Sequence, residues 1–155
     1  MEAILTSTAW KPAKHSGKGG PSGDEFANAQ IDAYLQGRRD EADQVRKIVL
    51  AQIKQNTAEA AKLSTRILEH LEKKGVKAGL TRLRIVSLDH LEVLIEIPEK
   101  EFISKKFFST YDLANKLENE SRTELFSVSF SFLGVAGKVD EAHMRSDGFT
   151  FTLKS

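Results

Sequence analysis

The chain has 155 residues, of which 40% are hydrophobic and 29% charged, and its formal net charge is +1. This composition fits one compact domain with an appendage, and the charge provides no overall field that would attract nucleic acid or a membrane. The lack of cysteine excludes disulfides, thiolate nucleophiles and cysteine-ligated metal centres. No apolar run is long enough for a transmembrane helix and no secretory signal is recognised, so we expect a cytoplasmic protein.

Residues 1–23 are predicted to form a flexible tail, because Ser, Thr, Gly, Pro and Lys dominate residues 6–23 and leave little apolar area to bury. The Gly-Lys-Gly-Gly-Pro-Ser-Gly segment within them lacks the Gly-Lys-Ser/Thr ending and the preceding strand of a phosphate-binding loop. Ser22 and Glu25 then have the spacing of a capping box, which predicts the start of a helix.

Helices are expected over about 24–36 and about 39–74, because apolar residues recur there at steps of three and four. Gly37 marks one break, and Asn56 is a candidate cap for a fresh helix. The Lys73-Lys74-Gly75 sequence predicts the end of the second helix. We therefore divide the chain into the tail, a helical arm at 24–56 and a sandwich domain at 57–155.

Beyond the long helix, the pattern predicts a β-hairpin and a second helix. Strands are expected at 82–88 and 92–98, joined by a three-residue loop that pairs Leu83 with Ile97 and Arg84 with Glu96. A helical stripe then spans 99–120, although Ser109 is an alternative, later start. Its expected inner face consists of Ile103, Phe107, Tyr111, Ala114 and Leu117.

The clearest strand signal lies at Leu125–Leu133, where apolar residues alternate with a row of serines. A weak edge strand is expected at 138–145, and a last strand at 149–153 after the Asp147-Gly148 turn. The inward residues of the serine-rich strand are Phe126, Val128, Phe130 and Phe132, and the wet face is expected to show Ser127, Ser129, Ser131, Thr150 and Thr152.

This order of elements predicts an α+β fold: a long N-terminal helical arm followed by a two-layer sandwich with an antiparallel sheet. Helix, hairpin, helix and strands match a circularly permuted ferredoxin-like fold, in which the first strand has moved to the end. An unrelated α+β sandwich is the alternative. No protein family is recognised in the residues themselves.

The search for catalytic and metal-binding motifs predicts no catalytic residue, no metal site and no cofactor. The four histidines are scattered without a metal-ligand spacing. Asp89, His90, Asp140 and His143 would form an acid/base site only if two distant segments converged, and solvent-exposed loops are the favoured interpretation. An enzyme with a site there remains one hypothesis.

Two further hypotheses concern partners. A small sandwich can cover one long helix but not a second helical segment, so the arm needs another partner, which is either a hairpin fold-back at Gly37 or a second copy. We favour a non-enzymatic interaction module that self-associates through this arm, with the apolar stripe Ile31, Leu35, Val45, Val49 and Ile53. The alternative is a nucleic-acid-associated protein with phosphate contacts from Lys11, Lys14, Lys18, Arg38 and Arg39.

Overall fold

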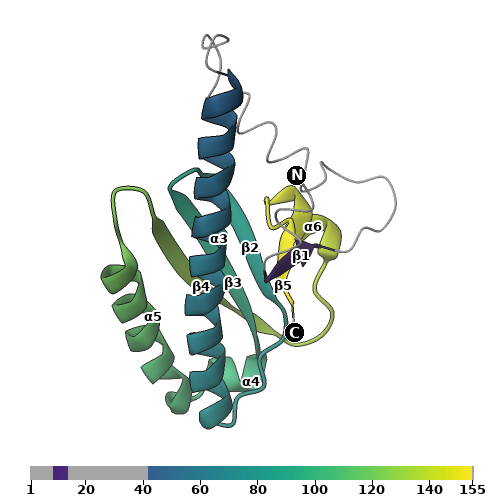
Figure 1. Ribbon diagram of the computed structural model, residues 1–155. Helices are drawn as coiled ribbons and strands as arrows, with labels where there is room; N and C mark the ends of the chain where they lie inside the picture. Colours follow the sequence, from purple (N-terminus) through teal and green to yellow (C-terminus); the bar gives the residue numbers. More distant parts are fainter. Residues whose placement is uncertain (1–8, 14–41, 155) are drawn as a thin grey trace.

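The computed structural model describes residues 9–13 and 42–154. It has the expected α+β class: helices α3 and α5 lie against a five-stranded sheet of order β1-β5-β2-β3-β4 (Figure 1). The elements are β1 (Trp10–Pro12), α3 (Ala42–Lys73), β2 (Thr81–Ser87), β3 (His90–Pro98), α4 (Glu99–Phe102), the 3-10 turn η2 (Lys105–Phe107), α5 (Phe108–Ser121), β4 (Ser127–Val135), α6 (Glu141–Ser146) and β5 (Phe151–Leu153).

Helix α3 is the dominant element, with 32 residues in one unbroken run. It passes through Asn56 without a restart, so the expected arm and sandwich share one helix. Its C-terminal end is confirmed at the predicted glycine: Gly75 has φ of 73°, and its N–H donates to the Glu72 carbonyl at 3.0 Å. The Val76 N–H donates to the Leu71 carbonyl at 2.9 Å, which completes a Schellman motif. The helix predicted at 24–36 lies outside the described residues.

One hydrophobic core lies between the sheet and the inner faces of α3 and α5. Ile53, Ile67 and Leu71 of α3 pack in the same buried cluster as the inward residues of β2, β3 and β4. The alternation predicted for the serine-rich strand is confirmed, since Phe126 and Val128 are buried and Phe130 and Phe132 pack against the core. The contributors from β2 and β3 are Leu83, Ile85, Leu91, Val93, Ile95 and Ile97.

The sheet is mixed, which corrects the expectation of an antiparallel sheet. Strand β4 pairs with β3 in parallel, whereas β1–β5, β5–β2 and β2–β3 are antiparallel. The cause is the helical crossover through α5, which returns the chain to the end of the sheet where β3 began. A ferredoxin-like sheet separates the two strands of such a unit by another strand. Because β3 and β4 are direct neighbours, the permuted ferredoxin-like arrangement is not confirmed.

The hairpin β2–β3 exists, but the predicted register is wrong by four residues. Leu83 lies opposite Val93 and Arg84 opposite Glu92, rather than Ile97 and Glu96. The turn leaves only two residues between the strands. An irregularity between Ile85 and Ser87 then shifts the pairing, so that the apolar residues of β2 lie opposite apolar residues of β3. The prediction considered only regular pairing, so it lengthened the loop where the protein uses a bulge.

Two short segments also differ from expectation. The weak strand expected at 138–145 is wrong, because α6 forms there instead. Asp140 caps this helix, since its Oδ1 accepts a hydrogen bond from the His143 N–H at 3.1 Å. Thr150 and Thr152 were expected on the wet face and are buried. Part of the expected tail is likewise ordered, because residues 10–12 form β1 on the edge of β5.

Candidate functional site

The structure places the described part of the predicted apolar arm partly inside the protein's own core. Val49 and Ile53 are 4% and 3% exposed, and Val45 is half-buried against the same cluster. These side chains are therefore covered within the chain. Ile31 and Leu35, the other two residues of the predicted stripe, lie outside the described residues.

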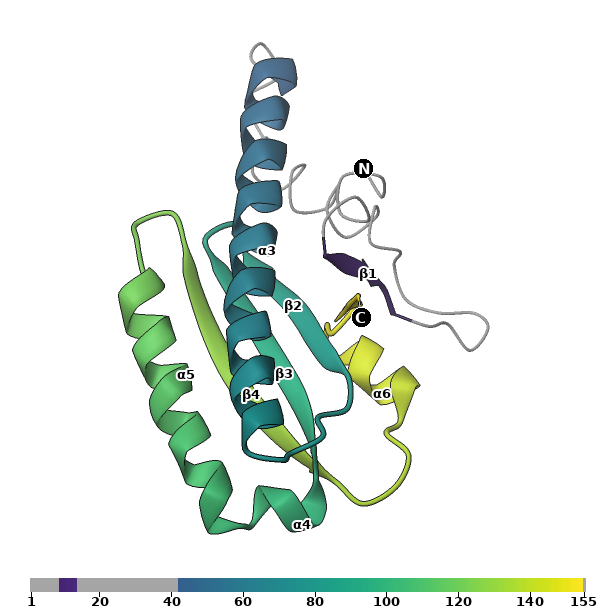
Figure 2. The same cartoon turned by 60° about the horizontal axis from the view of Figure 1, so that its bottom comes forward.

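The first turns of α3 nevertheless extend past the sheet (Figures 1 and 2). A helix of 32 residues is about 48 Å long, whereas the 9 residues of β3 span about 30 Å. The sheet therefore cannot cover the whole helix. Near the start of α3, Ile48 is 68% exposed. It lies three residues after Val45, so the two side chains are neighbours on the helix surface.

A second feature of this region was missed from the sequence, namely the docking of β1. Trp10 has no exposed surface and is the largest of the fully buried side chains. Its indole Nε1–H donates to the Thr57 carbonyl oxygen of α3 at 2.8 Å. The Ala13 N–H donates to the Thr150 carbonyl at 2.8 Å, and the Lys154 N–H donates to the Ala9 carbonyl at 2.7 Å. In the sequence, Trp10 was the one residue that could have indicated this docking, because it is a large aromatic side chain in a polar segment.

For the docking of β1, the favourable and unfavourable free-energy contributions are of similar size. Fixing about five residues costs about 5–10 kcal/mol of backbone entropy. Burying a whole tryptophan removes roughly 150–250 Å² from water, which contributes about 4–6 kcal/mol. About five hydrogen bonds add about 1 kcal/mol each. The gain and the cost therefore differ by only a few kcal/mol.

Of the five basic residues predicted to contact phosphate, the structure describes Lys11 alone. Lys11 lies on β1, opposite Thr152, with its side chain exposed. The other four candidates, Lys14, Lys18, Arg38 and Arg39, lie outside the described residues.

The four candidate acid/base residues each have a local partner. Asp89 accepts a hydrogen bond from Ser87 at 2.7 Å within the β2–β3 turn. His90 Nδ1 lies 2.8 Å from the Ser127 hydroxyl on the neighbouring strand. Asp140 caps α6, and His143 pairs with Asp147 one turn further on at 3.3 Å. Within residues 9–13 and 42–154, no three metal-ligating side chains gather.

A buried ion network that the sequence did not predict fastens α6 to the sheet. Arg82 is 0% exposed; its Nε donates to Glu96 at 2.7 Å, and its two terminal nitrogens donate to Glu141 of α6, both at 2.7 Å. The hydrogen bond to Glu141 raises the pKa of Arg82 against the opposing effect of burial, and Glu96 raises it further. Arg82 neighbours Leu83, whose side chain faces the core, so it points to the opposite face of the sheet. The network therefore holds α6 on the face opposite α3.

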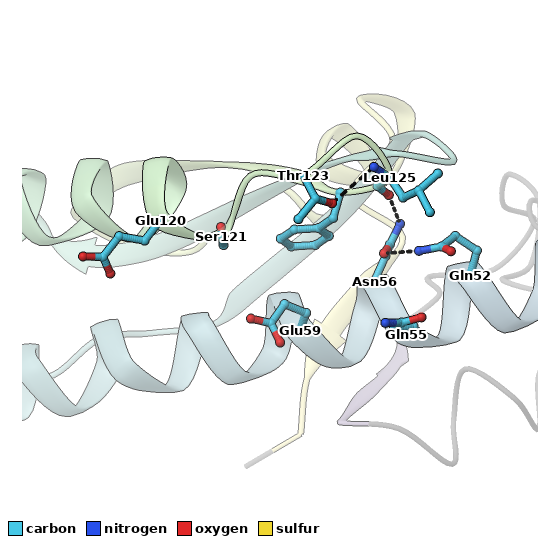
Figure 3. A pocket seen from close by; sticks show the side chains of 9 residues that line it. Gln52, Gln55, Asn56, Glu59, Glu120, Ser121, Thr123 and Leu125 are labelled. Carbon is cyan, nitrogen blue, oxygen red and sulfur yellow. Dashed lines mark hydrogen bonds between the residues drawn. The ribbon is translucent and has the colours of Figure 1, made fainter.

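The pocket in Figure 3 lies between α3 and the segment that leads from α5 into β4. Its volume is about 410 Å³, and amides and carboxylates form much of its lining. Asn56 joins three segments here: its Nδ2 donates to the Leu88 carbonyl at 2.8 Å and the Leu125 carbonyl at 2.9 Å, and its Oδ1 accepts from Gln52. Asn56, expected to cap a helix, is therefore a buried residue within α3 that hydrogen-bonds two other segments. The lining residues are Gln52, Gln55, Asn56, Glu59, Glu120, Ser121, Thr123, Leu125 and Phe126.

No protein family, curated protein or solved structure matches this chain. Among the described residues, no helix combines the length and apolar character needed to cross a membrane. The functional argument therefore depends on surfaces that the fold itself presents.

The outer edge of β4 is not one of those surfaces. The Ser127 N–H donates toward β3, to the Asp89 carbonyl at 2.7 Å, so the backbone groups of alternate residues, including Phe130, point outward. The Phe130 N–H donates to Glu118 Oε1 of α5 at 2.7 Å. A carboxylate over an edge amide blocks the addition of a further strand. Two features remain as candidates for binding: the projecting start of α3 and the docked strand β1.

Proposed function

We propose that the protein is a non-enzymatic interaction module that self-associates through its N-terminal helical region. Two observations carry the proposal: the first turns of α3 extend past the sheet, and Ile48, seven residues into this helix, is 68% exposed. An isolated helical end gains most of its stability from packing an apolar face against a partner. The predicted stripe residues Ile31 and Leu35 would extend the same interaction surface toward the N-terminus.

A second copy of the chain is the partner that this surface favours. The described start of α3 carries both signs of charge, with Asp43, Arg46 and Lys47 close together, so it selects neither an acidic nor a basic partner. Two identical helical ends related by a two-fold axis bring the Ile48 side chains of the two copies together without uncompensated charge.

The test is the molar mass of the full chain, measured by light scattering at rising concentration. We expect a mass above that of one chain. Ile48→Glu replaces an exposed apolar side chain, so it should leave folding intact and weaken association tenfold or more, because burying an isoleucine contributes about 1.5–3 kcal/mol. Ala58→Glu is the control, because Ala58 is also exposed on α3 but follows Thr57, whose carbonyl accepts the hydrogen bond from Trp10 of β1.

Weakening by both substitutions would assign the association to general charge rather than to the projecting end. A single-chain mass at the highest attainable concentration would overturn the proposal.

A further inference from the structure

We infer that the edge of β5 and the Trp10 socket form a strand-acceptor site for residues 9–13 of a second copy, so that associated chains exchange β1. The inference rests on the proposed self-association and adds the segment that is exchanged. Adding a strand to a sheet edge is a common mode of recognition, in which main-chain hydrogen bonds supply affinity and a pocket for one side chain supplies specificity.

The site contains both parts of that recognition mode. The main-chain part is the antiparallel register in which Lys11 lies opposite Thr152 and Pro12 opposite Phe151. The pocket part is the complete burial of Trp10 and its 2.8 Å hydrogen bond to the Thr57 carbonyl. Residues 9–13 of a second copy have the same sequence, so they fit the site without any change in the site.

The distance along the chain permits the exchange. Residues 14–41 separate the segment from α3; with the predicted helix over 24–36 rising about 20 Å and the other 15 residues extended over about 50 Å, this link reaches about 70 Å. A link of this length gives the chain's own β1 an effective concentration of order millimolar at most. A free second copy at micromolar concentration does not compete with it. A copy already held through α3 offers its β1 at a comparable effective concentration, so exchange follows association.

Pro12 makes the outer edge of the docked β1 a poor site for a further strand. The hydrogen bonds of Ala9 and Ala13 to β5 place the backbone groups of the alternate residues, Trp10 and Pro12, on the outer side of β1. Proline has no N–H to donate, so the outer edge of β1 is a poor template for another strand. Stacking of assemblies edge to edge through β1 is therefore disfavoured.

The experiment uses the absence of native cysteine. One full chain carries Lys11→Cys, and a second, size-tagged full chain carries Thr152→Cys. These two positions are directly opposed in the register, and opposed residues of an antiparallel pair are close enough for a disulfide. Because the two cysteines lie on different chains, only exchange brings them together. The matched control mixes Lys11→Cys with Ser146→Cys, an exposed position on α6.

After mild oxidation, non-reducing electrophoresis measures the tagged–untagged product. We expect at least tenfold more product from the Lys11/Thr152 mixture than from the control mixture. Emission from the only tryptophan, Trp10, verifies that β1 is docked in each variant. Light scattering is run on the same samples. Associated chains that yield no more product than the control overturn the exchange and leave the proposed function standing, whereas chains that remain single overturn both.

Discussion

Replacing Arg82 with methionine tests the buried ion network most sharply. Methionine keeps much of the aliphatic volume of arginine but removes the charge, which leaves the Glu96 carboxylate without its cation. The Glu96 side chain is only 11% exposed, so water replaces the lost partner only in small part. Breaking a buried pair by removing one member costs about 3–5 kcal/mol. We therefore expect Arg82→Met to lower the free energy of unfolding by about 3–5 kcal/mol.

Two companion variants make the reasoning refutable. Glu141→Gln removes a carboxylate whose side chain is 35% exposed, so solvent screening limits its loss to about 1 kcal/mol. The double variant Arg82→Met/Glu96→Leu removes both buried charges and should recover most of the stability. Urea unfolding followed by circular dichroism measures all three. A loss below about 1 kcal/mol for Arg82→Met, or no recovery in the double variant, would refute the argument.

Three other expectations follow from single contacts. Asn56→Ala removes the donor to the Leu88 and Leu125 carbonyls and should cost about 1–3 kcal/mol in urea unfolding, whereas exposed Gln55→Ala should cost under about 0.5 kcal/mol. Burial, then the charges of Lys74 and Lys73, lower the pKa of His70, so the folded state favours the neutral imidazole. The free energy of unfolding should therefore fall as the pH drops below about 6.5. Thermal melting at pH 7 and pH 5 measures this, and the melting temperature of His70→Gln should fall less between the two pH values than that of the unchanged chain. Gly148→Ala should destabilise more than Gly75→Ala, because both have positive φ but only at Gly148 does an added Cβ lie 2.7 Å from another side chain.

The sequence predicted the elements whose signal is local. The Lys73-Lys74-Gly75 sequence marked the end of α3 because a glycine in the left-handed region satisfies the last carbonyls of a helix. The alternation around Phe130 marked β4 because a strand with one buried face has a period of two. Both signals depend on residues that are neighbours in the chain.

What depends on distant partners was not predictable in the same way. The register of β2 on β3 is set by a bulge, and pairing rules alone shift it by four residues, which misassigned Glu96 to Arg84 instead of Arg82. The parallel pairing of β4 depends on which strand the crossover returns to. Docking of Trp10 depends on a socket formed by α3 and β5, so a segment with a tail-like composition becomes part of the sheet.

The central claim is that copies of this chain associate through the projecting end of α3, and sedimentation equilibrium over a hundredfold dilution series tests it most directly. The account predicts a mass that falls toward that of one chain on dilution, with the midpoint moved to at least tenfold higher concentration by Ile48→Glu and unmoved by Ala58→Glu. The mass of a single chain throughout the series would contradict it.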